Sequence, residues 1–242
     1  MELYLEAINL KKSYHQKTVV DDVSIKVKRG EVVGLLGANG AGKTTTFSLI
    51  LGLIPKDRGE ILLDGEEISG LPMYRRAQKG LSLLPQEPSV FRKLSVEENL
   101  LSIMETLPSD HSRRNDTLAQ ILQELGLEKL AKAKAYTLSG GERRRLEIAR
   151  ALITNPEFIL LDEPFTGIDP LAVLDLQEII LSLKEKGLGV LITDHSVRDT
   201  LKIVDRAYII NRGKILKEGT PEELVNSKEV KKIYLGEGFS LS

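Results

Sequence analysis

The chain has 242 residues, of which 41% are hydrophobic and 29% are charged, and its formal net charge is -1. This composition predicts one compact domain with room for a smaller inserted lobe, and the near-zero charge argues against strong non-specific binding to nucleic acid. Because the chain has no cysteine, disulfides and thiolate metal sites are excluded, which fits a reducing cytoplasm.

The N-terminal segment MELYLEAINL does not have the basic stretch and apolar core of a signal peptide. No apolar run reaches the length of about 20 residues that a membrane helix needs. We therefore expect any membrane association to be indirect, through a partner. Within the same region, LYLEAINL and then VVDDVSIKV alternate apolar and polar residues, which predicts antiparallel strands with one solvated face.

Three later segments are short and continuously apolar: EVVGLL, FILLD and GVLIT. Such runs are typical of strands that are buried on both faces of a parallel sheet. Each precedes a polar or glycine-containing turn and a helix-like segment, so the sequence predicts an α/β fold. Near the C-terminus, YIINRGKILKEG is a candidate hairpin, and TPEE predicts a helix with proline at its first position.

Between Ser95 and Ala135 the pattern changes to helical periodicity. SVEE predicts a capping box, and four apolar residues recur on one helical face: Leu118, Ile121, Leu122 and Leu125. We interpret this stretch as an inserted helical subdomain. The expected organisation is a single domain over 1–242, with a core formed by 1–94 and 136–242 and a helical subdomain at 95–135.

The stretch GANGAGKTT, from Gly37 to Thr45, matches a P-loop and has the strand–loop–helix setting that the pattern requires. Glycines allow consecutive backbone N–H groups to surround a β-phosphate. Lys43 is long enough to reach the β- and γ-phosphate oxygens, and Thr44 offers a hydroxyl to Mg²⁺. The predicted ATP-binding residues of this loop are Gly37, Asn39, Gly40, Gly42, Lys43, Thr44 and Thr45.

Two carboxylates follow the apolar run FILL. Asp162 and Glu163 would emerge at the carboxyl end of a central strand, where ligands of open parallel sheets bind. An isolated Asp-Glu pair favours a solvated acidic turn, but a neighbouring P-loop reverses that preference. We predict that Asp162 holds Mg²⁺ and that Glu163 orients or deprotonates the attacking water.

Three further polar residues become candidates only beside a nucleotide. His195 follows GVLIT and would sense the γ-phosphate, although a lone histidine is more often a core residue. Gln86 in LLPQEP could contact Mg²⁺ or the water, with an ordinary loop residue as the alternative. Tyr14 could stack on adenine, with a half-exposed structural tyrosine as the alternative.

The stretch LSGGERRR heads another helical segment. Ser139 followed by Glu142 is a capping box, which leaves Gly140 and Gly141 unexplained. Glycine lets a backbone come close to another group, and a helix N-terminus attracts anions. The segment is therefore a second candidate for contact with a phosphate.

Together these motifs resemble the nucleotide-binding subunit of ABC transporters over nearly the whole chain. GANGAGKT resembles the Walker A motif, FILLDE the Walker B motif, Gln86 the Q-loop, LSGGE the signature motif, GIDP the D-loop and His195 the switch histidine. They occur in the family's order, and LSGGE separates this family from other P-loop NTPases. The resemblance implies an ATPase that uses ATP and Mg²⁺.

The resemblance also implies an ATP-dependent, head-to-tail homodimer. The nucleotide on one P-loop would then face Ser139, Gly140 and Gly141 of the other copy, and Asp169 would reach across the same interface. ATP would close the dimer, and loss of the γ-phosphate would let the halves separate. Lys43, Glu163, His195 and Gln86 would form the catalytic group, with Thr44, Gln86 and Asp162 at the metal.

Longer stretches, such as LPQEPSVFRKLSVEENL and IYLGEGF, resemble the ATPases of lipopolysaccharide export machines. This likeness implies a chain on the cytoplasmic face of the inner membrane, where coupling helices of two transmembrane permease subunits would dock on Val90, Phe91 and Arg92. Ordinary core packing is the alternative for Val90 and Phe91.

Two other functions stay open at the sequence level. The ATPase subunits of branched-chain amino-acid importers share the length and much of the motif pattern. A soluble, non-transport ABC protein that acts on nucleic acid or ribosomes is less consistent, because such proteins commonly carry two ATPase units or a long coiled-coil insertion. A nucleotide switch without hydrolysis is disfavoured, because Glu163 and His195 are both present.

Overall fold

Two β-sheets form the frame of the molecule in the computed structural model, which describes residues 3–107 and 111–240. The strands are β1 (Tyr4–Tyr14), β2 (Lys17–Lys28), β3 (Val32–Leu36), β4 (Arg58–Leu63), β5 (Glu66–Glu67), β6 (Leu81–Leu84), β7 (Phe158–Asp162), β8 (Gly189–Thr193), β9 (Arg206–Asn211) and β10 (Lys214–Gly219). The α-helices are α1 (Lys43–Leu51), α2 (Met73–Gln78), α3 (Val96–Met104), α4 (His111–Glu124), α5 (Gly140–Leu152), α6 (Pro170–Glu185), α7 (Val197–Leu201), α8 (Pro221–Asn226) and α9 (Lys228–Val230). Short 3-10 turns occur at Glu128–Leu130 and Ala135–Thr137, and a π-helical turn at Lys231–Leu235.

The first sheet is antiparallel, with the strand order β2-β1-β4-β5. Its inner residues, such as Leu5, Ala7 and Leu10, are buried, while the residues between them reach the surface. This alternation confirms the two antiparallel strands that the sequence predicts. The reason is physical, since a sheet with one solvated face buries every second side chain.

The second sheet has six strands in the order β10-β9-β3-β8-β7-β6. From β9 to β6 all neighbours are parallel, and β10 pairs antiparallel with β9. The α/β fold, the three buried parallel strands and the C-terminal hairpin are therefore confirmed. Because parallel strands align their carboxyl ends, the segments after β3, β6, β7 and β8 meet at one edge of the sheet.

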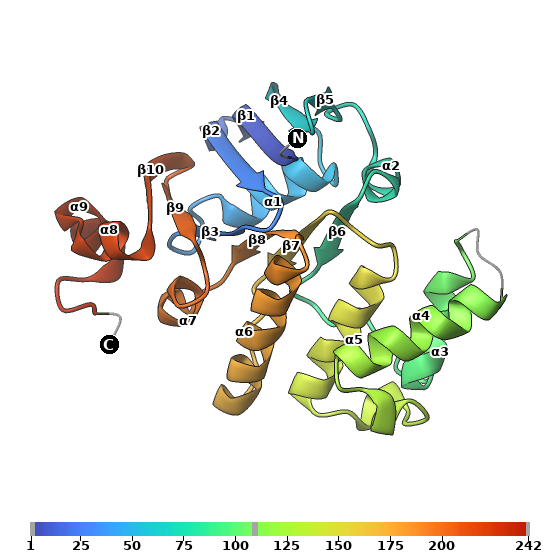
Figure 1. The fold of residues 1–242 in the computed structure, drawn as a ribbon. Coiled ribbons are helices and arrows are strands. Elements are labelled where there is room, and N and C mark those ends of the chain that lie inside the picture. Colours follow the sequence, from blue (N-terminus) through green and yellow to red (C-terminus); the bar gives the residue numbers. More distant parts are fainter. Residues whose placement is uncertain (1–2, 108–110, 241–242) are drawn as a thin grey trace.

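Helices cover both faces of this sheet (Figure 1). On one side, α1 lies between the two sheets, where Phe47 and Ile50 pack with Leu10 and Val33 in one buried cluster. On the other side lie α5, α6 and α7, whose apolar residues belong to a second cluster. The P-loop helix α1 is thus held by both sheets, which fixes the start of the helix at the sheet edge.

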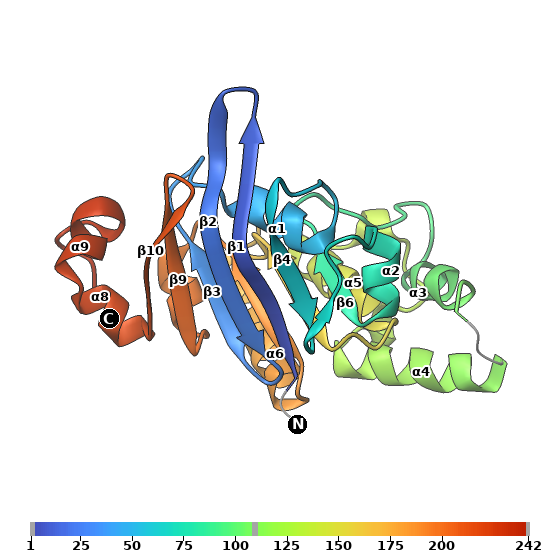
Figure 2. The ribbon, with the colours of Figure 1, turned by 90° about the horizontal axis from the view of Figure 1, so that it is seen from above.

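A helical lobe lies at one end of the molecule, and α8 and α9 lie at the other end (Figure 2). The predicted capping box at α3 is confirmed: Ser95 Oγ accepts from Glu98 N at 3.1 Å, and a Glu98 carboxylate oxygen accepts from Ser95 N at 2.5 Å. The apolar face of α4 packs inward, with Ile121 buried and Leu118 half-buried. Helix α5 contacts α3, α4, α6 and β6, and so joins the lobe to the core.

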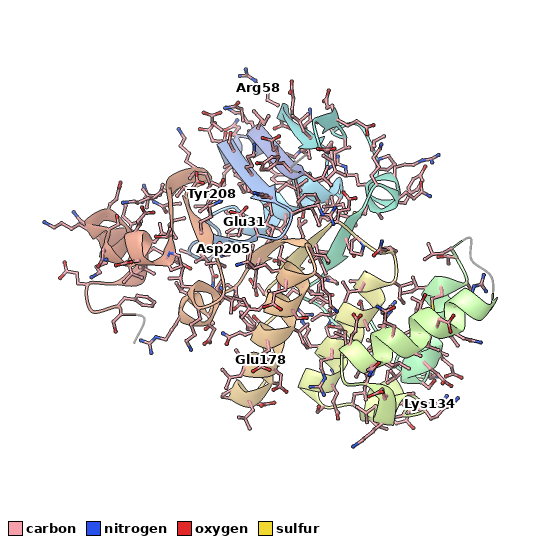
Figure 3. All side chains as sticks on the ribbon, viewed as in Figure 1. Glu31, Arg58, Lys134, Glu178, Asp205 and Tyr208 are labelled. Carbon is pink, nitrogen blue, oxygen red and sulfur yellow. The ribbon has the colours of Figure 1, made fainter. Side chains whose placement is uncertain are left out.

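Polar contacts fasten the start of the P-loop strand (Figure 3). The Asp205 carboxylate accepts from Val32 N at 2.9 Å and from Lys184 Nζ at 2.5 Å. Arg206 donates to Glu31 at 2.7 Å and to the Tyr208 hydroxyl at 2.7 Å. These bonds tie β3 to β9 and to α6 at the edge opposite the P-loop.

The predicted late helix is also confirmed. Thr220 caps α8 by accepting from Glu223 N at 3.3 Å, and Pro221 occupies the first helical position. None of the helices in 3–107 and 111–240 is both long and apolar enough to cross a bilayer.

Candidate active site

An open pocket of about 300 Å³ lies at the carboxyl edge of the parallel sheet. It brings together residues that the sequence analysis selected from four separate segments. Since these segments follow β3, β6, β7 and β8, the pocket is a direct result of the parallel strand order. The lining residues are Val19, Asn39, Gly40, Gly42, Lys43, Thr44, Thr45, Gln86, Glu163 and His195.

The phosphate loop needs glycine at its two ends. A Cβ at Gly37 would lie 2.2 Å from the Ile210 carbonyl oxygen, and one at Gly42 would lie 2.9 Å from the Val19 carbonyl oxygen, at a φ of 116°. Gly42 is the N-cap of α1, which within the described chain has no side-chain cap and no acidic residue in its first turn. The N–H groups at this helix start are available to an anion.

Lys43 is folded back over the loop. Its Nζ donates to the carbonyl oxygens of Gly37 at 2.7 Å and Ala38 at 3.2 Å, and the residue is 6% exposed. Burial lowers the pKa of Lys43, against the opposing effect of nearby carboxylates, of which Glu163 and Asp162 are the strongest. The loop carbonyls and these carboxylates thus hold the Lys43 side chain against the phosphate loop, in the lining of the pocket.

Glu163 is a buried carboxylate with contacts to two other residues of the pocket. It is 5% exposed, and its backbone has a φ of 49°, a conformation that costs about 1–3 kcal/mol for such a residue. Gln86 Nε2 donates to Glu163 Oε2 at 2.7 Å, and His195 Nε2 lies 2.7 Å from Glu163 Oε1. Three residues that the sequence analysis selected one by one are therefore joined through a single carboxylate.

The oxygen donors fit a magnesium ion. Thr44 contributes a hydroxyl at the start of α1, and Asp162 contributes a half-buried carboxylate at the end of β7. Across 3–107 and 111–240, no group of three or more His, Cys, Asp or Glu residues could hold a metal without other ligands. Mg²⁺ commonly takes one or two protein oxygens and completes its shell with substrate phosphates and water, so the donor set suits a metal that binds together with a nucleotide.

The sequence analysis missed two residues next to His195. Thr193 Oγ1 donates to Asp162 Oδ1 at 2.6 Å. Asp194 is 1% exposed, and its carboxylate accepts from Phe165 N at 2.9 Å and Ser196 N at 2.8 Å. Burial raises the pKa of the Asp194 carboxyl, against these backbone bonds. A signal was present, because both are polar residues at the end of an apolar strand, as Asp162 is.

The second candidate phosphate segment lies outside this pocket. The capping box is confirmed: Ser139 Oγ accepts from Glu142 N at 3.3 Å, and Glu142 Oε2 accepts from Ser139 N at 2.8 Å. Ser139 and Gly140 are exposed, and neither they nor Gly141 line the pocket. Asp169 is also exposed and outside it, and caps α6 by accepting from Ala172 N at 3.0 Å.

The two signature glycines differ in their surroundings. A Cβ at Gly141 would lie 2.8 Å from Ala172 Cβ, which is too close, so the packing of α5 on α6 requires this glycine. A Cβ at Gly140 would lie 3.6 Å from Ile168 Cγ2, an ordinary contact. The packing of the folded chain requires glycine at position 141, whereas it leaves room for a side chain at position 140.

Tyr14 stands at the end of β1, 45% exposed, with Lys12 Nζ 5.4 Å from its ring centre. It is not one of the residues that line the pocket. Its stacking on adenine therefore stays a prediction.

The segment after Gln86 divides into a core part and a surface part. Val90 is 9% exposed and belongs to the main hydrophobic cluster, while Phe91 is 50% exposed and Arg92 is exposed. Asn99 fixes Phe91 by accepting from its N–H at 2.8 Å and donating to its carbonyl oxygen at 3.0 Å. Core packing thus accounts for Val90, and the surface open to a partner consists of Phe91 and Arg92.

Comparisons with known proteins agree with this geometry. The ABC transporter family model matches residues 20–166, more than half of the chain. The lipopolysaccharide export system ATP-binding proteins LptB of Acidithiobacillus ferridurans and Escherichia coli K12 are 54% and 51% identical; the first match covers 100% of both chains, and the second covers 98% of this chain and 99% of the relative. A solved ATP-binding cassette of an ABC transporter, in its ADP conformation, is similar with a TM-score of 0.85 at 31% identity, over 98% of this chain and 100% of that one.

Proposed function

The chain belongs to the ABC transporter family as an ATP-binding subunit and ATPase, and from this premise we propose that the machine it drives exports lipopolysaccharide. The ATPase activity is supported above all by the Glu163 carboxylate, held between Gln86 and His195 beside the P-loop. The choice of lipopolysaccharide is supported by the relatives of that function, which are similar over their whole length. Full-length likeness of this kind favours lipopolysaccharide export over amino-acid import.

The proposed roles in hydrolysis are divided among the phosphate loop, the magnesium ligands and the Glu163–His195 pair. The N–H groups of the loop and the Lys43 ammonium would bind the β- and γ-phosphates, while Thr44, Asp162 and Gln86 would hold Mg²⁺. When bound, Mg²⁺ neutralises charge that develops on the phosphates. Glu163 would orient the attacking water and accept its proton, and His195 would contact the γ-phosphate.

We further propose that two copies sandwich ATP head to tail. The support is the position of Ser139 and Gly140, which form the N-terminus of α5 but are exposed and outside the chain's own pocket. The α5 N-terminus of the second copy would bring its N–H groups and positive dipole end to the γ-phosphate. Asp169, exposed at the start of α6, would lie at the same interface.

The membrane partner is proposed to dock on Phe91 and Arg92. Arg150 stacks on the Phe91 ring, with its guanidinium carbon 4.8 Å from the ring centre, so the exposed aromatic side chain has a packing partner at the surface. Coupling helices of two transmembrane permease subunits would bind there and place the chain at the cytoplasmic face of the inner membrane. The chain itself would not touch lipopolysaccharide.

Substitution of the proposed base tests the ATPase assignment. Glu163→Gln keeps the shape and the contact with Gln86 but removes the proton acceptor, so the turnover rate should fall by about 10²–10⁴-fold while ATP binding is retained. Glu185→Gln, an exposed carboxylate at the end of α6, is the matched control and should hydrolyse ATP normally. Near-normal turnover by Glu163→Gln would remove the residue from this role.

The transported substrate is tested by the membrane partners. Tagged protein purified from membranes should carry two permease subunits with periplasmic β-jellyroll domains. Amino-acid permeases in their place would contradict lipopolysaccharide export and leave the ATPase assignment intact.

A further inference from the structure

Thr193, the last residue of β8, is fully buried and has no role in the chemistry described so far. Its Oγ1 donates to Asp162 Oδ1 at 2.6 Å. The same Oγ1 accepts from Glu163 N at 3.3 Å, and the Thr193 carbonyl oxygen accepts from Glu163 N at 2.9 Å. One residue therefore contacts both members of the acidic pair on the neighbouring strand.

The direction of the hydroxyl proton follows from these contacts. A backbone N–H can only donate, so Thr193 Oγ1 is the acceptor toward Glu163. A carboxylate that is ionised can only accept, so the hydroxyl proton points at Asp162. The threonine side chain is thus held in one orientation by two neighbours of opposite hydrogen-bonding type.

The sheet topology produces this contact. β7 and β8 are parallel neighbours, and their register pairs Asp162 directly with Thr193. β8 also pairs with β3, the strand that leads into the P-loop. The end of β8 consequently lies between the strand of the phosphate loop and the strand of the two carboxylates.

We propose that Thr193 is a positioning residue that sets the orientation of the metal-holding carboxylate. The hydroxyl occupies Oδ1 of Asp162 with a hydrogen bond. The other carboxylate oxygen, Oδ2, would then be available to Mg²⁺ or to a water bound to the metal. The proposal rests on the nucleotide and magnesium roles given above. It assigns to this buried threonine the function that outer-shell hydrogen-bond partners have at many metal sites, where they orient the ligand.

The substitution Thr193→Val isolates the hydroxyl. Valine keeps the β-branched shape that suits a strand, and its backbone carbonyl still accepts from Glu163 N. The donor to Asp162 at 2.6 Å is lost, together with the longer side-chain acceptor of Glu163 N at 3.3 Å. Thr193→Ser keeps that donor and should behave as the wild type does.

A matched control is available at Thr200, which is also fully buried. Its hydroxyl, in α7, donates to the carbonyl oxygen of Ser196, the residue before the helix, at 3.0 Å. Thr200→Val removes a buried threonine hydroxyl of similar kind. It therefore measures the general cost of the exchange without touching the metal carboxylate.

The readout is metal binding rather than turnover. Mn²⁺ replaces Mg²⁺ as the probe, ADP is present at saturation, and free Mn²⁺ is followed by electron paramagnetic resonance on the full chain. Thr193→Val should weaken Mn²⁺ binding by about 10–100-fold, the usual effect of losing an outer-shell partner. Thr193→Ser and Thr200→Val should bind Mn²⁺ as the wild type does, and ADP affinity in EDTA should be equal for all four proteins.

Wild-type Mn²⁺ affinity in Thr193→Val would overturn the proposal, as would an equal loss in Thr200→Val. If Thr193→Val does not fold, Thr193→Ala removes the same donor with a smaller side chain and is measured in its place. The ATPase assignment is judged separately, by turnover of the wild-type protein with Mg²⁺. A wild type that hydrolyses ATP alongside an unaffected Thr193→Val would refute only the positioning role.

Discussion

At the residue scale, Gly140 and Gly141 lie side by side at the start of α5 but face different neighbours. An added Cβ would be 2.8 Å from Ala172 Cβ at Gly141 and 3.6 Å from Ile168 Cγ2 at Gly140. Only the first distance forces the packing of α5 against α6 to change. Substitutions at the two positions can therefore distinguish a glycine that the packing requires, Gly141, from a glycine that is proposed to allow close approach to the partner's ATP, Gly140.

Alanine at each position tests this distinction. Gly141→Ala overpacks the α5–α6 contact and should lower the free energy of unfolding by about 1–3 kcal/mol. Gly140→Ala should change that free energy by no more than about 1 kcal/mol, since alanine is the better helix former. Yet its ATPase rate should fall by about tenfold or more, because a methyl group would displace the helix start from the γ-phosphate.

Denaturant unfolding and steady-state ATPase assays on the two variants provide the measurement. Full activity in a stable Gly140→Ala protein would mean that the helix start does not approach the nucleotide closely.

The individual site residues differed in how far the sequence could predict them. Asp162 and Glu163 were found because a carboxylate that follows an apolar strand is visible in the sequence alone. Thr193 follows the same rule, but its contact with Asp162 cannot be predicted from the sequence, since it depends on which strand lies next to β8. That neighbour relation, Asp162 opposite Thr193, arises from the strand order and is not encoded by local periodicity.

At the scale of elements, three helices begin with the same capping box: α3 at Ser95, α5 at Ser139 and α8 at Thr220. Local chemistry accounts for all three in the same way, because the side-chain oxygen satisfies an N–H group at the helix start. Only α5 is proposed to face ATP. The α3 box is therefore a control for the structural part of the α5 box.

Removing the two serine caps compares these roles. Ser95→Ala and Ser139→Ala should each lower the free energy of unfolding by about 1 kcal/mol. Ser139→Ala should also lose most of the ATPase activity, whereas Ser95→Ala should retain it. If Ser95→Ala and Ser139→Ala have equal stability and equal ATPase rates, Ser139 acts only as a helix cap.

The α5 box also predicts a dependence of stability on pH. The Ser139 backbone N–H, followed by its hydroxyl, lowers the pKa of Glu142 in the folded chain. A lowered folded pKa means that the ionised carboxylate adds stability above its ordinary value of about 4.3, and that this contribution disappears as the pH falls through the folded value. The wild type should thus be more stable than Glu142→Gln at neutral pH, and the difference should close in acid.

Denaturant unfolding of both proteins from neutral pH into acid measures this difference. Glu98→Gln should follow the same course, because the Ser95 N–H and then Lys134 lower the pKa of Glu98 in the α3 box. If the difference in free energy of unfolding between wild type and Glu142→Gln does not change with pH, the ionised Glu142 carboxylate is not its cause.

The elements themselves were largely predictable, but their arrangement was not. Alternation identified β1 and β2, and apolar runs identified β3, β7 and β8, because burial on one or both faces dictates those patterns. The same patterns do not predict that β8 lies between β3 and β7. The position of α5 was also hidden, since the contacts of α5 with α3, α4 and α6 depend on tertiary packing that the helical period does not specify.

At the scale of the whole molecule, the nucleotide chemistry is divided between two places. The pocket is lined by residues of the phosphate loop, by Gln86 and by the proposed base Glu163, whereas Ser139, Gly140 and Asp169 are exposed outside it. A head-to-tail pair would unite the two parts twice, once for each copy. An interface of this kind can be detected by the ATPase activity of mixtures of two inactive variants.

Two variants that are each inactive should restore activity when mixed. Lys43→Ala damages the phosphate loop. Gly140→Asp places a carboxylate at the start of α5, where the helix tolerates it but the partner's γ-phosphate is repelled. After free exchange, about half of the dimers contain one chain of each kind. In such a dimer one site carries both defects, and the other combines the intact loop of the Gly140→Asp chain with the intact α5 start of the Lys43→Ala chain.

The mixture should therefore hydrolyse ATP faster than the sum of the two variants measured alone, and the gain should grow with protein concentration as mixed dimers form. A Lys43→Ala, Gly140→Asp double variant mixed with inactive Glu163→Gln is the control. In that pair one site lacks the loop lysine, and the other lacks the base and faces the altered α5 start, so neither is intact and no gain is expected. If each chain instead used its own α5 start, every chain in the first mixture would carry its own lesion, and mixing would leave the rate unchanged.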